Sequence, residues 1–96
     1  MNDLKISKTL AVTKADFLRL LPSAMCGLSY KIKQNDIVAI QKKSRIEINL
    51  QEKKSRKIGA ISLPQLQIDF CFVDWQKVDV DRFIERFNRN FQRGGG

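Results

Sequence analysis

The stretch DVDRFIERFNRNFQR, residues 79–93, decides the fold, because two kinds of side chain recur in it at helical spacing. One set is apolar and falls on a single helix face: Val80, Phe83, Ile84, Phe87 and Phe91. The other set is basic and follows another side of the helix: Arg82, Arg86, Arg89 and Arg93. We therefore predict an amphipathic helix whose aromatic face covers the core and whose arginines face outward.

The ends of this helix follow from local chemistry. Asp79 or Asp81 favours the positive N-terminal end of a helix, and the arginines suit the negative C-terminal end. Three glycines follow at positions 94–96, and glycine weakens a helix. We expect the helix to stop at Arg93 and residues 94–96 to form a flexible glycine tail.

A covering helix needs a sheet, and residues 45–51 give the clearest strand pattern in the chain. Apolar Ile46, Ile48 and Leu50 alternate with polar neighbours, so that one face of the strand is apolar and the other polar. Residues 4–12 and 66–72 alternate in the same way. Each clear strand therefore has one face for a core and one for solvent, as in a sheet covered on a single side.

Polar turns divide the middle of the chain into short strands. We expect turns at Asn35-Asp36 and Lys43-Ser44, a charged turn at residues 52–55, and a break at Pro64. Residues 57–61 would then pair back as a further short strand. The result is an antiparallel meander of short strands.

A first helix is predicted from residue 14. Thr13 can cap its free amides, Asp16 complements its positive end, and Val12 can contact Phe17 as a hydrophobic staple. Pro22 lacks a backbone donor and should end or kink this helix after about two turns. Two amphipathic helices are thus available to cover the sheet.

These elements predict an α+β fold: a two-layer sandwich in which a largely antiparallel sheet of five to six strands carries two helices on one face, in the order β-α-β4/5-α. The chain of 96 residues is long enough for one small core and too short for two. We expect residues 1–93 to form a single compact domain.

Composition and charge narrow the class of protein. The chain is 43% hydrophobic and 29% charged, which is typical of a globular protein. No apolar stretch approaches the roughly 20 residues of a transmembrane helix, and the start lacks a secretory signal, so we expect a cytoplasmic protein without a membrane span. The net charge of +8 favours anionic partners.

Few residues suit catalysis. The chain has no histidine, and its two cysteines, Cys26 and Cys71, are far apart and form no CxxC pair. Cofactor fingerprints are also missing from the sequence. Asp69 and Asp74 remain as acids without a partner base. We therefore expect no enzyme activity, no metal and no cofactor.

Two basic clusters flank the central strand. The first comprises Lys42, Lys43 and Arg45, and the second comprises Lys53, Lys54, Arg56 and Lys57. About 20 Å of strand separates them, so together they could contact phosphates along a duplex without reading its sequence. The alternative is that these side chains keep the edges of the sheet soluble and discourage aggregation.

The arginines of the C-terminal helix allow similar alternatives. Guanidinium groups suit bidentate contacts with phosphate or carboxylate, whereas Glu85 and Arg89, at i and i+4, could simply form a surface pair. Trp75 precedes this helix and either covers the edge of the core or, if exposed, contacts a partner. No aromatic residue falls on the open sheet face, which argues against base stacking there.

The sequence favours a small non-enzymatic binding module and leaves two hypotheses for its partner. The first is an acidic protein or a second copy of the chain, bound at the open sheet face or a free sheet edge. The second is nonspecific nucleic-acid binding through the basic hairpin, residues 42–57, and the helix arginines. A continuous basic surface joining hairpin and helix would favour the second hypothesis.

Overall fold

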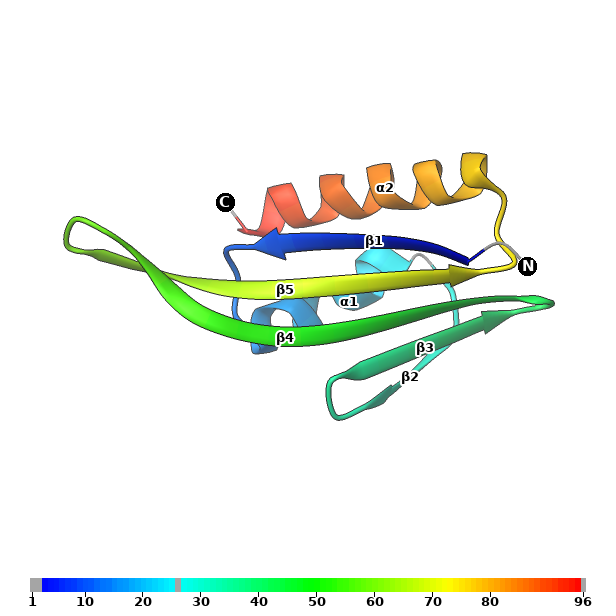
Figure 1. The fold of residues 1–96 in the computed structure, drawn as a ribbon, viewed down its shortest axis with the longest axis horizontal. Helices are drawn as coiled ribbons and strands as arrows, with labels where there is room; N and C mark the ends of the chain where they lie inside the picture. Colours follow the sequence, from blue (N-terminus) through cyan, green and yellow to red (C-terminus); the bar gives the residue numbers. More distant parts are fainter. Residues whose placement is uncertain (1–2, 26, 96) are drawn as a thin grey trace.

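The computed structural model describes residues 3–25 and 27–95, and the side chains among them as far as Phe91. It contains a five-stranded antiparallel sheet and two helices, which confirms the α+β fold (Figure 1). In chain order the elements are β1 (Asp3–Leu10), α1 (Lys14–Met25), β2 (Tyr30–Lys33), β3 (Asp36–Gln41), β4 (Ser44–Ile58), β5 (Ile61–Val73) and α2 (Lys77–Gly95).

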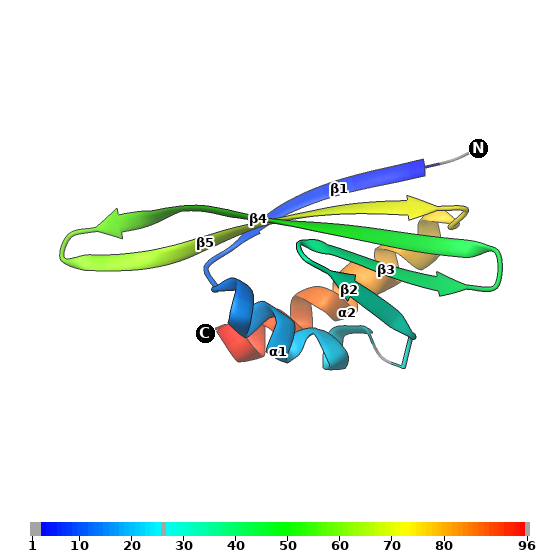
Figure 2. The same ribbon diagram turned by 90° about the horizontal axis from the view of Figure 1, so that it is seen from below.

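The strands lie in the order β1-β5-β4-β3-β2, and every neighbouring pair is antiparallel. β1 is therefore placed beside the last strand, with Leu10 opposite Leu66 and Asp3 opposite Val73. Both helices lie against the same face of this sheet (Figure 2). This arrangement gives the two layers that the sequence pattern predicted.

The core lies between the sheet and the helices, and all six phenylalanines of the chain are buried in it. Phe17 of α1 stacks on Phe91 of α2 at a centroid distance of 4.9 Å. Phe87 joins the helices to the sheet, because its ring meets Phe70 of β5 edge-on at 5.0 Å. Aromatic packing of this kind contributes energy beyond the burial of apolar area.

The start of α1 follows its predicted capping. The amide of Asp16 donates to Thr13 Oγ1 at 3.1 Å, and the amide of Phe17 donates to the Thr13 carbonyl at 2.9 Å. The helix does not end at Pro22, however, but continues to Met25. Met25 is buried in the core, so packing holds the last turn even though proline removes one helix bond.

The β4–β5 hairpin differs most from the sequence prediction. Residues 52–55 form no turn, because β4 continues through them to Ile58. The chain reverses instead at Gly59-Ala60, where Gly59 has a φ of 60°, an angle that glycine adopts without strain. Pro64 does not interrupt β5, because it lies at a register shift between the pairs Lys53↔Gln65 and Arg56↔Leu63, and a bulge tolerates proline.

The far part of this hairpin, residues 53–64, projects from the body and is called the arm here (Figures 1 and 2). β1 ends opposite Leu66 and β3 begins opposite Asn49, so within the described sheet the arm pairs only with itself. The arm accounts for the elongated shape, with a longest extent of 47 Å against 24 and 22 Å. It adds no residue to the buried core.

Both ends of α2 extend beyond the prediction. The helix begins at Lys77 rather than at Asp79 or Asp81, and the Gln76 carbonyl accepts the amides of Asp79 and Val80. It also includes Gly94 and Gly95, whereas we expected it to stop at Arg93. Glycine costs a helix only about 1 kcal/mol per residue, and a terminal turn can accept that. Gly96 lies outside the described residues.

Replacing Phe87 with alanine should lower the free energy of unfolding by about 3–5 kcal/mol, because the cavity would remove the ring contacts that join both helices to the sheet. Arg89→Ala, on the exposed side of the same helix, should change it by no more than about 0.5 kcal/mol. Urea unfolding followed by circular dichroism measures both. A loss below about 1 kcal/mol for Phe87→Ala would contradict this account of the core.

Candidate functional site

The structure separates the predicted basic residues instead of joining them. The second basic cluster lies on the arm, whereas Lys42 and Lys43 form the β3–β4 turn at the opposite end of β4. Arg45 pairs with Glu47 on the open sheet face, with Nε 2.8 Å from Oε2, so its charge is balanced locally. A strand of this length spans about 45 Å, which keeps the two ends of β4 well apart.

Two of the helix arginines, Arg82 and Arg86, lie away from the arm. Arg82 and Arg86 line a pocket together with Ser44, at the end of β4 that is remote from the arm. Arg89 is exposed farther along the helix, and the side chain of Arg93 lies outside the described residues. Arg82 and Arg86 therefore do not join the arm in the continuous basic surface that the sequence analysis considered.

The arm carries its charges on an exposed ribbon. Its four basic side chains are Lys53, Lys54, Arg56 and Lys57, and no acidic residue occurs from position 53 to 64. All four are exposed. Only Lys53 has a polar side-chain contact among the described residues, with its Nζ donating to Gln51 Oε1 at 3.2 Å. The arm is thus a cationic ribbon without internal neutralisation.

The tip of the arm is apolar. Ile58 and Ile61 face each other across the Gly59-Ala60 turn, and 52% and 61% of their surfaces are exposed. Sequence reasoning missed this pair because it placed the turn several residues too early. The signal was available in the glycine at position 59.

The open face of the sheet is mixed: Val38, Ile40, Cys71 and Val73 lie on it, beside polar side chains that bond to one another around Asp69. Ser7 Oγ donates to Asp69 Oδ1 at 2.6 Å, while Gln67 and Gln51 donate to the same carboxylate. The hydrogen bonds from Ser7 and then Gln67 lower the pKa of Asp69. A shallow hollow of about 760 Å³ lies over this network. Because these groups are already paired, a partner would have to break existing contacts.

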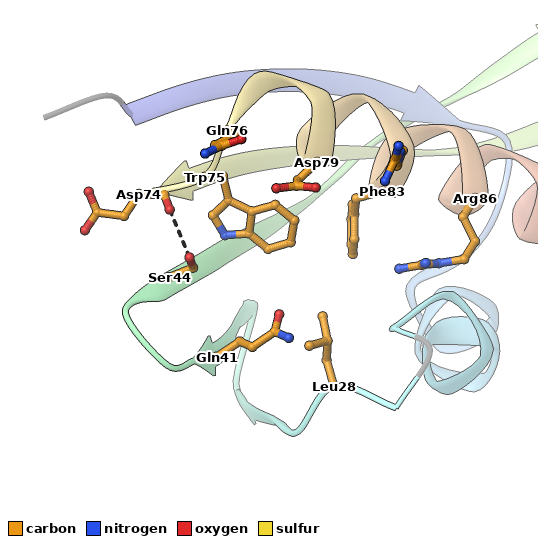
Figure 3. Close-up of a pocket in the computed structure, with 10 residues that line it drawn as sticks. Leu28, Gln41, Ser44, Asp74, Trp75, Gln76, Asp79, Phe83 and Arg86 are labelled. Atoms are coloured by element: carbon orange, nitrogen blue, oxygen red, sulfur yellow. Dashed lines mark hydrogen bonds between the residues drawn. The ribbon is translucent and has the colours of Figure 1, made fainter.

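A second hollow, as open to solvent as the first and about 650 Å³ in volume, lies between α2 and the ends of β3 and β4 (Figure 3). We call it the arginine pocket and define it by six lining residues: Leu28, Trp75, Asp79, Arg82, Phe83 and Arg86. They come from α2, the loop before it and the segment after α1, which are distant in sequence. The sequence analysis named Trp75 and the two arginines but could not bring them together.

Trp75 is held as part of the pocket wall. Its ring meets Phe72 and Phe83 edge-on at centroid distances of 5.1 and 5.8 Å, and its Nε1 donates to the Arg45 carbonyl at 3.1 Å. The preceding Asp74 has a φ of 60°, and its carbonyl accepts the Ser44 hydroxyl at 2.9 Å. The indole therefore covers the edge of the core and also contributes to the pocket surface.

Arg86 has an unmet hydrogen-bonding group. Its guanidinium carbon lies 5.8 Å from the centroid of the Phe83 ring, and its enclosed Nε has no hydrogen-bond partner among the described residues. The predicted Glu85–Arg89 pair is not one of the ion pairs formed within the described chain. The two pocket arginines are likewise absent from those pairs.

Other chemistry has little support in the described chain. No group of three or more metal-ligating side chains occurs among the residues that the structure describes. Cys71 is a half-buried free thiol of β5, and Cys26 lies outside the described residues. Within the described chain, no helix has the length and apolar character needed to span a membrane.

Asp69→Asn should reduce the pH dependence of stability in acid. The lowered pKa of Asp69 means that its carboxylate stabilises the fold fully above its ordinary value of 3.8, and that this stabilisation is lost as pH falls through the folded-state pKa. Urea midpoints at pH 6 and pH 2.5 should therefore differ less for the variant than for the wild type. Equal differences would show that the Ser7 and Gln67 hydrogen bonds do not favour the ionised form.

In comparisons with known proteins, no protein-family model matches this chain and no curated protein shows significant sequence similarity to it.

Proposed function

We propose that this protein is a non-enzymatic binding module that contacts duplex DNA through the arm, without reading its sequence. One observation carries the proposal: twelve residues project from the body with four exposed cations, no carboxylate and no contribution to the buried core. This favours the second hypothesis from the sequence, with the arm rather than the helix as its contact.

Folding alone gives no reason for such an arm. An isolated two-stranded ribbon is marginally stable in water, because it lacks a covered apolar face. Residues 53–62 are all exposed, so the arm gains little from the rest of the domain. Binding to an anionic surface would stabilise the ribbon and neutralise its charge in the same step.

Duplex DNA fits the arm in shape and charge. The major groove is about 12 Å wide and admits a two-stranded ribbon. Lysine and arginine on both sides of the register shift could contact phosphates while the ribbon follows the groove. Phosphate contacts position a protein without specifying bases, so we expect binding to depend on salt and little on sequence.

A free edge supports a second candidate function, self-association. Residues 61–65 of β5 lie beyond the end of β1 and contain no charged side chain. An uncharged edge strand can pair with the same strand of a second copy, here over residues 61–63, because Pro64 has no amide to continue the ladder. The open sheet face supports this candidate less well, because its polar side chains bond to one another.

DNA binding can be tested with a labelled mixed-sequence duplex of about 25 base pairs at 50 and 200 mM salt. Four phosphate contacts predict a loss of affinity of about 100-fold over this range. Changing Lys53, Lys54, Arg56 and Lys57 together to glutamine should abolish most of this affinity and most of the salt slope. Fluorescence anisotropy measures both quantities.

A matched control removes four other positive charges outside the arm: Lys31, Lys33, Lys42 and Lys43, each changed to glutamine. These four lysines are exposed on β2 and the β3–β4 turn, so this variant has the same net charge as the arm variant. It should retain most of the affinity. Equal losses in both variants would mean that overall charge, not the arm, governs binding, and no binding at 50 mM salt would reject the proposal.

Sedimentation equilibrium of the wild type and of Leu63→Lys tests the edge. If β5 edges pair, the wild type should sediment as a dimer, and a lysine in the pairing strand should convert it to a monomer. Circular dichroism checks that the variant remains folded. A monomeric wild type at 100 μM protein would reject self-association and leave the DNA proposal in place.

A further inference from the structure

We infer that the arginine pocket binds a small molecule in which a carboxylate or phosphate is attached to a planar apolar group. The pocket lies at the end of β4 remote from the arm, so this inference does not rest on DNA binding. Its volume of about 650 Å³ falls within the usual range of small-molecule sites. Aromatic, apolar and cationic groups meet in it.

The apolar part of the ligand would contact the ring of half-buried Trp75, because Phe83 belongs to the core and is only 2% exposed. Trp75 and Phe83 pack edge-on against each other, and Leu28 lies across the pocket from them (Figure 3). The indole N–H already donates to the Arg45 carbonyl, so Trp75 offers a ligand only its apolar ring surface. A flat ring or another planar apolar group suits such a wall.

The anionic part would contact Arg86 and Arg82. In Figure 3 the guanidinium of Arg86 points into the space beside Phe83 and Leu28. Its enclosed Nε is unpartnered, and an enclosed donor without an acceptor costs about 1–3 kcal/mol. A carboxylate or phosphate beside the guanidinium could accept from the terminal N–H groups of Arg86 and from Arg82. Nε itself has almost no accessible surface, so a ligand could pair with it only after the side chain turns.

Two carboxylates, Asp74 and Asp79, line the pocket beside the two guanidinium groups, so their formal charges balance. Asp79 lines the pocket from the first turn of α2, where the positive helix end offsets part of its charge. Asp74 also lines it, but Figure 3 shows its carboxylate directed away from the other labelled side chains. Neither forms an ion pair with Arg82 or Arg86 among the described residues. The guanidinium groups therefore remain available to an anion.

Tryptophan fluorescence can report ligand binding, because Trp75 is the only tryptophan in the chain and it lines the pocket. We would titrate the protein with phenyl phosphate and with benzoate, and follow tryptophan fluorescence. At least one of them should give a saturable change with a dissociation constant below about 1 mM, near −4 kcal/mol. The stronger of the two identifies the anionic group. Inorganic phosphate and phenol should each bind at least tenfold more weakly, because inorganic phosphate lacks the apolar ring and phenol lacks the anionic group.

Variants separate this site from the rest of α2. Arg86→Gln should weaken binding of the better probe at least tenfold, whereas Arg89→Gln, at an exposed position outside the pocket, should leave it unchanged. Urea unfolding of both variants shows whether the fold is intact. If Arg86→Gln is less stable, Arg82→Gln replaces it and should also weaken binding.

Two results would overturn the inference: a fluorescence change that rises linearly with either probe, as collisional quenching does, or equal affinities for the wild type and the Arg86→Gln variant. The arm variant with four glutamines should bind the probe as the wild type does. Failure of DNA binding and failure of the pocket are therefore observed independently.

Discussion

The pairing of β1 with β5 is the constraint on which the rest of the structure depends. It joins the first strand to the last, and Ser7 and Asp69 bond across it although 62 positions separate them. With β1 and β2 at opposite edges, α1 must cross the sheet to connect them. α2 then follows β5 back over the same apolar face, and this brings Phe17 against Phe91. Without this pairing, neither helix would have a complete surface to cover.

The sequence predicted elements well where burial determines periodicity. The alternation in residues 45–51 and the aromatic spacing of α2 both reflect one buried face, and both appear in the structure as expected. Prediction failed in the hairpin, where no core was involved, and at Pro22, where burial of Met25 extends the helix. In residues 52–55, charged side chains suit a turn and an exposed strand equally, so composition could not distinguish them. The arginine pocket was beyond local reasoning, because Leu28 and Phe83 meet only after the chain has folded.

The distribution of charge differs between the open sheet face, the arm and the arginine pocket. On the open face, cations and carboxylates are interspersed, as in the pair of Arg45 and Glu47. Such a face gains solubility without a strong field. The basic side chains of the arm, and Arg82 and Arg86, form no ion pair with a carboxylate among the described residues. These two places, at opposite ends of β4, are the anion sites that we propose, and they differ in the size of the anion they suit.

The register shift opposite Pro64 has a consequence for how this chain can vary. A bulge increases the local twist of a ribbon and ends the strict pairing imposed by the sheet. Because β1 and β3 do not reach it, residues can be added or removed in pairs on both strands beyond the bulge without changing which side chains face the core. The reach of the arm can therefore lengthen or shorten while the helices, the aromatic core and the sheet register stay unchanged.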